Sequence, residues 1–212
     1  MALKQPLCYT GGMKKKVIVL LAKGFEEVEA ITPIDYLRRS GIEVCVAAVF
    51  PDALYVKSAR GVEIKADAIL SELARDGKLS AAAWDGVVVP GGLPGADNLA
   101  ASEATGAFLK EMAAGDKLIC AICAAPARVL SPLGLLAGKN FTCYPGEEVK
   151  VLASGSASPG AVWKEDRVVE DGNLITSRGA GTAGEFSCRI VAKLAGEAAA
   201  KELAERVLLH LP

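Results

Sequence analysis

The stretch that decides the fold is Lys117–Leu130, with the sequence KLICAICAAPARVL. Leu118 and Ile119 suit a buried strand, whereas the AAPARVL that follows suits the opening of a helix. Because proline is tolerated in a helix only within its first turn, Pro126 fixes where this helix can begin. Cys123 therefore lies at a turn from strand to helix, beside the free N–H groups of the new helix. Such N–H groups favour a negative charge, so the spacing predicts a stabilised thiolate at Cys123.

The segments on either side of this turn alternate between strand and helix patterns. Near-continuous apolar runs, typical of strands buried in a parallel sheet, cover residues 16–22, 42–49 and 86–90. Helical patterns cover the residues leading to Ser40, and residues 103–114, 183–194 and 198–209. Residues 56–67 suggest a small hairpin, and Asp171-Gly172 between two apolar runs predicts a second one. The alternation predicts an α/β fold with a doubly wound, mostly parallel sheet, whose sites lie at the carboxyl ends of the strands.

Length and composition indicate one globular domain. The chain has 212 residues, 51% of them hydrophobic and 23% charged, which is enough for one substantial core. We expect a single domain over residues 14–212. Residues 1–13 read as a poorly ordered N-terminal extension that ends at a second potential start, Met13.

Charge and hydropathy argue against several classes of partner. A formal net charge of −1, with no basic run longer than Lys14–Lys16, gives no reason to expect nucleic acid or an acidic membrane. No apolar segment is long enough to span a membrane, and the apolar run in MKKKVIVLLA, residues 13–22, is too short for a secretory signal. The six cysteines, several within apolar patterns, suit free thiols, so we expect a cytoplasmic protein.

Two motifs near the ends of strands favour ordinary structural explanations. Cys120 and Cys123 form a C-x-x-C pair, but Cys120 falls inside the strand, where a dithiol cycle is disfavoured and a structural role is the alternative. Residues Gly179–Gly184 match G-x-G-x-x-G, yet only helix follows them, whereas a dinucleotide site needs a further strand ending in an acid. Their glycines suit a tight turn packed beside another site. We expect no cofactor and no metal.

Polar groups follow two other strands. The stretch GFEEVEA places Glu26, Glu27 and Glu29 at the start of a helix, where the helix dipole favours acids. Parallel strands bring such turns together, so one carboxyl, held neutral by burial, could face the cysteine turn and act as an acid or base. The glycines in VVVPGGLPGADNL, residues 87–99, could join the N–H of Ala124 in an oxyanion hole, and a plain tight turn is the alternative.

These stretches together carry a family resemblance. LAKGFEEVEA, VVVPGG…GADNL, AICAAP and LITSRGAGTAGEF occur in the order typical of the ThiJ/PfpI superfamily. From Lys14 to Leu209 the chain resembles the Parkinson-disease-protein-like branch of that superfamily. The resemblance implies a flavodoxin-like fold, with the sheet sandwiched by helices, a homodimer, and an oxidation-prone cysteine on a nucleophile elbow.

The resemblance also implies roles for individual residues. It makes Cys123 the reactive cysteine and Glu29 the buried carboxyl that is hydrogen-bonded to its sulfur. It assigns backbone donors to Gly92 and Ala124. The residues that it places around the substrate pocket are Gly91, Tyr144 and, at the dimer-side rim, Arg60.

One position departs from the family's pattern. Many members carry a histidine where FTCYPGEE has Tyr144, and the single histidine here, His210, falls at the end of the last predicted helix. A phenol stays protonated at neutral pH and takes up a thiol proton poorly, so neither a Cys–His pair nor protease activity is expected. The thiolate would then depend on the helix N-terminus and on local hydrogen bonds.

The resemblance implies a stress-related protein whose Cys123 reacts with a small aldehyde or with peroxide. As an enzyme it would be glyoxalase III/deglycase-like, converting methylglyoxal-type α-oxoaldehydes or glycation adducts, with Cys123 adding to the aldehyde carbon and Glu29 moving a proton. The alternative is a non-enzymatic redox sensor or chaperone-like protein that uses the same cysteine. No stretch resembles a thiazole-phosphate or kinase site, so a thiamine-related role is not expected.

The expected homodimer has a candidate surface. Val28, Ile31 and Ile34 recur at a spacing of three residues in the helical segment after the first strand, which gives that helix an apolar face. The same face could instead pack on the protein's own sheet.

Overall fold

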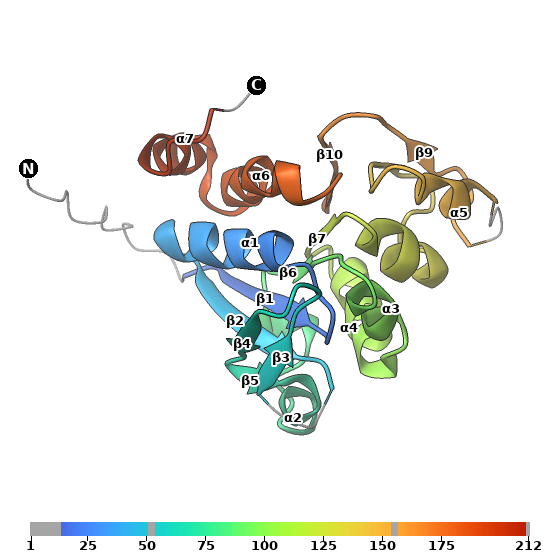
Figure 1. The fold of residues 1–212 in the computed structure, drawn as a ribbon, viewed down its shortest axis with the longest axis horizontal. Coiled ribbons are helices and arrows are strands. Elements are labelled where there is room, and N and C mark those ends of the chain that lie inside the picture. Colours follow the sequence, from blue (N-terminus) through green and yellow to red (C-terminus); the bar gives the residue numbers. More distant parts are fainter. Residues whose placement is uncertain (1–13, 51–53, 154–156, 211–212) are drawn as a thin grey trace, which may run out of the picture.

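A seven-stranded sheet runs through the centre of the molecule, and helices cover both of its faces (Figure 1). The computed structural model describes residues 14–50, 54–153 and 157–210, so the extension predicted for residues 1–13 lies outside the described residues. The strand order is β10-β11-β7-β6-β1-β2-β5, and every neighbouring pair is parallel except β10 with β11 at one edge. The α/β fold with a doubly wound, mostly parallel sheet is therefore confirmed.

The elements follow one another in the predicted alternation. The strands of the large sheet are β1 (Lys16–Leu21), β2 (Glu43–Ala48), β5 (Ala68–Ile69), β6 (Gly86–Val89), β7 (Leu118–Ile122), β10 (Val168–Asp171) and β11 (Leu174–Ser177). The helices are α1 (Glu27–Arg39), α2 (Leu70–Arg75), α3 (Gly95–Ala100), α4 (Glu103–Ala114), α5 (Glu148–Ala153), α6 (Ala183–Ala195) and α7 (Glu197–Arg206). Shorter helical turns cover Ala81–Ala83, Pro126–Leu130, Ser131–Leu133 and Ala180–Thr182.

Four short strands form two separate pairs. β3 (Tyr55–Lys57) and β4 (Glu63–Lys65) are antiparallel, and β8 (Asn140–Phe141) runs parallel to β9 (Val162–Trp163). The β3–β4 pair is the hairpin predicted for residues 56–67, and β10–β11 is the one predicted around Asp171-Gly172.

Alternate residues of the central strands bury the two faces of the sheet. In β1, Val17, Val19 and Leu21 pack with apolar residues of α1, α6 and α7, which lie together on one face in Figure 1. Ile18 and Leu20 point to the opposite face, where α3 and α4 cover the sheet. Both faces are buried, which is why these strands read as continuous apolar runs in the sequence.

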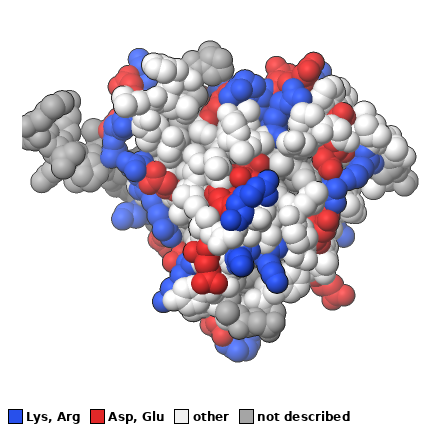
Figure 2. Space-filling model, viewed as in Figure 1, with Lys and Arg blue, Asp and Glu red and all other residues white. Residues whose placement is uncertain are grey.

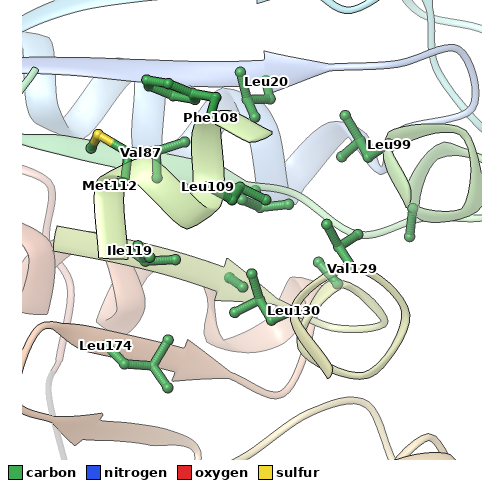
Figure 3. Packing of buried hydrophobic residues seen from close by; sticks show 14 of the residues in the cluster. Leu20, Val87, Leu99, Phe108, Leu109, Met112, Ile119, Val129, Leu130 and Leu174 are labelled. Carbon is green, nitrogen blue, oxygen red and sulfur yellow. The ribbon is translucent and has the colours of Figure 1, made fainter. Parts of the chain in front are cut away.

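The α4 helix shows how one of these layers is held. Phe108, Leu109 and Met112 lie on its sheet-facing side and are at most 2% exposed. Figure 3 shows them around Val87 of β6, with Ile119 of β7 on the next strand. Burying a side chain of this size stabilises the fold by about 1.5–3 kcal/mol, so the helix is fixed by its apolar face.

The end of the chain differs from the prediction. The last helix was predicted over residues 198–209 with His210 at its end, but α7 stops at Arg206. Leu208 has a φ of 56°, in the left-handed region, which a continuing helix does not allow. His210 is therefore exposed and lies beyond the helix.

The surface carries charges of both signs. Figure 2 shows basic and acidic side chains interspersed over one face, with neither sign gathered into a broad patch there. Within residues 14–50, 54–153 and 157–210, no helix is both long and apolar enough to cross a membrane.

Candidate functional site

Cys123 lies directly after β7, in the turn that leads into the helical residues Pro126–Leu130. Its φ is 65°, a left-handed conformation that costs a non-glycine residue about 1–3 kcal/mol and persists only where its surroundings impose it. The neighbours that hold it are known: the Cys123 N–H donates to Ser177 O at 2.9 Å, and Cys123 O accepts from the Tyr144 N–H at 2.8 Å. The predicted turn from strand to helix at Cys123 is therefore confirmed.

Glu29 brings a buried carboxyl to this turn from the first turn of α1. The residue is 1% exposed, and its carboxyl is hydrogen-bonded to the Cys123 side chain. Two backbone N–H groups also reach the carboxyl: Gly91 donates to Oε2 at 3.0 Å, and Ala180 donates as well. Burial raises the pKa of Glu29 to about 7, with a smaller contribution from the charge of Glu26, although these hydrogen bonds act in the opposite direction. Glu29 can thus exchange a proton near neutral pH.

The other two glutamates of GFEEVEA have separate partners. Glu26 caps α1, where its side chain accepts from the Glu29 N–H at 2.8 Å. Glu27 accepts from the Ser58 hydroxyl at 2.5 Å and from the Arg60 N–H at 2.6 Å. The three acids therefore have different roles. Glu26 caps α1, Glu27 binds Ser58 and Arg60, and Glu29 is hydrogen-bonded to the sulfur.

The thiol is affected by opposing influences. Burial is the largest and raises the pKa of Cys123, as do the charge of an ionised Glu29 and the hydrogen bond to it. The N–H groups of Gly92 and Ala124 both donate to the sulfur and lower the pKa, but they do not outweigh burial. The N–H groups to which the family resemblance assigned this role thus favour the thiolate, but burial of the sulfur next to an acid opposes it more strongly, so the pKa of the thiol lies above its usual value.

Protonation of Glu29 changes this balance. A neutral carboxyl no longer repels a thiolate and can donate its own hydrogen bond to the sulfur. Because the pKa of the thiol stays above that of Glu29, the first proton lost from the pair leaves the carboxyl, and a thiolate beside a neutral Glu29 is the minor form that carries the same total charge. Glu29 and Cys123 consequently titrate as one unit.

Two glycines are required by the close packing around this pair. A Cβ on Gly91 would lie 2.7 Å from both Cys123 Cβ and Glu29 Oε2. Gly92 has a φ of 88°, and a Cβ there would lie 2.4 Å from the Glu26 N atom. Any side chain at these positions would displace the sulfur, the carboxyl or the start of α1.

The remaining residues predicted for the pocket lie at its rim or outside it. The Tyr144 side chain is 53% exposed, and a Cβ on Gly179 would lie 3.5 Å from its Cδ2 and 3.8 Å from Glu29 Oε1. Gly179, in the G-x-G-x-x-G segment, therefore lies close to both Tyr144 and Glu29, which agrees with the tight turn packed beside another site that its glycines suggested. Arg60 is exposed, and its contacts go to Glu27.

The structure adds groups that the sequence did not indicate. The Ala180 N–H that binds Glu29 is one of them, and the ion pairs of Arg128 described below are another. A partly buried arginine and its acidic partners leave no periodic signal in a sequence. Cys120 is 1% exposed within β7, as predicted. The described part of the chain holds no group of three or more His, Cys, Asp or Glu side chains suited to a metal ion.

An open parallel sheet with a left-handed cysteine turn beside a buried carboxyl defines a flavodoxin-like protein with an elbow cysteine. The chain belongs to the DJ-1/PfpI family, whose family model matches residues 15–193.

Individual relatives agree with this membership. Protein dj-1beta of Drosophila melanogaster is 41% identical over 93% of this chain and 98% of its own length. The crystal structure of that protein has a TM-score of 0.84, with 40% identity over 94% of this chain and 100% of its own. A Caenorhabditis elegans relative named a glutathione-independent glyoxalase is 34% identical over 86% of this chain and 90% of its own length.

Proposed function

We propose that this protein is a glyoxalase of the glutathione-independent type, which converts small α-oxoaldehydes to α-hydroxy acids at Cys123. One observation carries the proposal: a buried carboxyl with a pKa raised to about 7 is hydrogen-bonded to a cysteine on a strained elbow. The relative named a glutathione-independent glyoxalase supports the same activity class.

The two side chains suffice for the chemistry. The Cys123 thiolate adds to the aldehyde carbon, and the resulting alkoxide takes the proton of a neutral Glu29, which gives a hemithioacetal. Glu29, now ionised, removes the hydrogen on that carbon to form an enediolate and returns the proton to the neighbouring carbon. The hydroxyl proton of the attacked carbon passes to the neighbouring oxygen, which gives an α-hydroxy thioester. Water then hydrolyses the thioester, which releases the hydroxy acid and restores the thiol. The net reaction adds one water to the aldehyde and needs no oxidant or reductant.

Backbone N–H groups would stabilise the charged species along this path. Gly92 and Ala124 donate to the sulfur, and they are therefore close to where an oxygen on the attacked carbon would carry negative charge. Burial of the pair strengthens these interactions, because water competes less for them.

The experiment is a turnover assay on the purified protein. Methylglyoxal and other small α-oxoaldehydes, with early glycation adducts in the same screen, are supplied without glutathione, and formation of the hydroxy acid is followed. We expect turnover that is lost in Cys123→Ala. Full turnover in Cys123→Ala, or none in the native protein with any of these substrates, would reject the enzymatic proposal.

A redox-sensing role is the second candidate, favoured by the same hydrogen bond. One peroxide would oxidise the Cys123 thiol to a sulfenic acid and a second would take it to a sulfinate, with one water released at each step. A protonated Glu29 would then donate a hydrogen bond to the sulfinate. The intact mass of the protein after mild peroxide tests this role. Addition of two oxygens at Cys123 in a protein without turnover would favour the redox sensor. A chaperone-like activity that uses the same cysteine belongs to this second candidate.

Homodimer formation is part of the proposal. Ile34 is only 8% exposed and packs on the protein's own core, whereas Val28 and Ile31 are 47% and 41% exposed on the same helix. Beside them, Glu27 Oε2 is buried without a hydrogen-bond partner among the described residues. A second copy seated on α1 would cover both apolar side chains. Light scattering should give about twice the chain mass of 21.9 kDa, and a mass near that of the monomer would count against the dimer.

The cytoplasm remains the proposed location. The five described cysteines, Cys45, Cys120, Cys123, Cys143 and Cys188, are free thiols, which suits a reducing compartment.

A further inference from the structure

Arg128 joins three segments that surround Cys123. It lies one turn after the elbow, and its backbone N–H donates to Ala124 O at 2.9 Å. Its guanidinium donates through Nε and Nη2 to both carboxylate oxygens of Glu147, at 2.9 and 3.0 Å. The third nitrogen, Nη1, donates to both oxygens of Asp97, at 2.7 and 3.0 Å. This arrangement uses the fixed fork of donors that only arginine offers.

Arg128, Glu147 and Asp97 together are called the clamp here. Its Glu147 end is bonded to the turn 144–147 at the rim of the site. The Glu147 N–H donates to Tyr144 O at 3.0 Å, and the Tyr144 N–H donates to Cys123 O at 2.8 Å. The turn 144–147 is therefore fastened at one end to the elbow and at the other end to Arg128. Lys150 adds a second cation to Glu147, at 2.8 Å.

The Asp97 side leads to the opposite wall. Asp97 lies in α3, and the N–H of its neighbour Ala96 donates to Gly92 O at 2.9 Å. The loop that supplies the Gly92 N–H to the sulfur is thus held by the same guanidinium. α3 and α5 both contact the helical turn that carries Arg128, and Figure 1 shows the three helical segments together.

The clamp is partly shielded from water. The Glu147 and Arg128 side chains are 14% and 22% exposed, whereas most other ion pairs of the described residues involve at least one side chain that is more open. Burial opposes ionisation of Glu147, yet hydrogen bonds from Arg128 and Lys150 outweigh it and lower the pKa of Glu147. The carboxylate therefore stays charged and paired over the whole neutral pH range.

We propose that Arg128 is a positioning residue that fixes the turn 144–147 against Cys123 and so sets the width of the approach to the sulfur. The clamp keeps the half-exposed Tyr144 close to Gly179 and to the elbow, and it excludes bulky electrophiles while small ones reach Cys123. The proposal deepens the function proposed above, since it selects small aldehydes, but it concerns access to the sulfur and does not require turnover.

Alkylation of Cys123 by reagents of two sizes tests the clamp. The rates with iodoacetamide and with N-phenylmaleimide are measured by mass spectrometry of the peptide that contains Cys123. Arg128→Met should raise the ratio of the maleimide rate to the iodoacetamide rate by about threefold or more, because a loosened wall admits the larger reagent. Arg128→Lys keeps the positive charge but loses the paired donors of the guanidinium, so its ratio of rates should lie between those of the native protein and Arg128→Met. Arg39→Met is the matched control, since Arg39 pairs with Asp35 on the surface of α1 at 2.7 Å.

A second variant protects the test against misfolding. Glu147→Gln leaves the Arg128–Asp97 pair in place and should raise the same ratio. A role in stability alone would lower the unfolding temperature and leave the ratio unchanged. An unchanged ratio in a folded Arg128→Met protein overturns the proposal, and if that variant does not fold, an unchanged ratio in Glu147→Gln overturns it. If the native protein shows no glyoxalase turnover but Arg128→Met raises the ratio of the two alkylation rates as expected, the proposed enzymatic function is rejected and the proposed role of the clamp is supported.

Discussion

The carboxyl of Glu29 and the sulfur of Cys123 meet across the end of β6, the strand that separates β1 from β7 in the sheet. Gly91, two residues after the end of β6, lies next to both groups and donates its N–H to Glu29. The segments that follow three neighbouring strands thus meet here. Glu29 follows β1, Gly91 follows β6 and Cys123 follows β7.

Replacing Glu29 by Gln separates proton transfer from sulfur chemistry. The amide keeps the size and a hydrogen-bond donor but cannot move the proton, so any aldehyde turnover should fall by about 100-fold or more. Cys123 should still be alkylated by iodoacetamide. The native profile of alkylation against pH should bend near pH 7, where Glu29 titrates, and this bend should vanish in Glu29→Gln. Glu103→Gln, an exposed acid in the first turn of α4, is the control. An unchanged profile in Glu29→Gln would mean that carboxyl and sulfur do not interact.

The same carboxyl should make stability depend on pH. Its pKa is 4.5 in an unfolded chain and about 7 in the fold, so between these values the folded state binds the extra proton. The free energy of unfolding should therefore fall as the pH rises from 4.5 to 7, by up to about 3 kcal/mol from this group. Urea unfolding on either side of this window measures the drop, which should disappear in Glu29→Gln. Equal drops in both proteins would contradict the raised pKa.

Gly91→Ala should damage the site more than the fold. The added methyl would lie 2.7 Å from Cys123 Cβ and from Glu29 Oε2, so one of them must move. Overpacking of this kind costs about 1–3 kcal/mol of stability, and misplacement of the reacting groups should lower turnover by about 100-fold. In Gly181→Ala the methyl meets nothing within 4 Å, and both properties should stay close to those of the native protein. Comparable turnover in the two variants would show that the spacing at Gly91 does not matter.

The sequence was informative wherever a pattern was long or chemically restrictive. The apolar runs of the central strands and Pro126 at the helix opening were sufficient to predict the sheet and the position of Cys123 at its turn. Short elements such as β5, β8 and α3 were not predicted. They span only two to six residues, and their conformation depends on neighbours distant in sequence.

The candidate site also contains residues that the sequence pattern could indicate and residues that it could not. Three acids stand at the start of α1, and helix geometry alone does not say which one meets Cys123; a family resemblance singled out Glu29. The Arg128 clamp depends on Asp97 and Glu147, which helix α3 and the turn 144–147 bring to the same guanidinium. Nothing in the spacing of these three residues marks them as partners, so only the folded chain reveals them.

Cys120 should be dispensable for any chemistry at Cys123. Its side chain is 1% exposed, and burial raises the pKa of its thiol well above the usual value, so it cannot resolve a disulfide in this fold. Cys120→Ala should keep turnover and peroxide reactivity at Cys123, at a cost of about 1–2 kcal/mol of stability for the small cavity. Peptide mapping after mild peroxide should find oxygen on Cys123 and none on Cys120. A Cys120–Cys123 disulfide in that map would restore the dithiol alternative.

Tyr144 should matter through its ring and not through its hydroxyl. The ring lies near Gly179, and the residue is 53% exposed, whereas Glu29 already occupies the place of a proton acceptor beside the sulfur. Tyr144→Phe keeps the ring and should therefore leave turnover and the alkylation profile within about twofold of the native values, the range of a lost exposed hydrogen bond. Tyr144→Ala removes the ring and should speed alkylation by N-phenylmaleimide while iodoacetamide reacts as before. If Tyr144→Phe lost turnover as completely as Glu29→Gln, the phenol would have to take part in proton transfer, and Glu29 could not be the sole acid and base of the site.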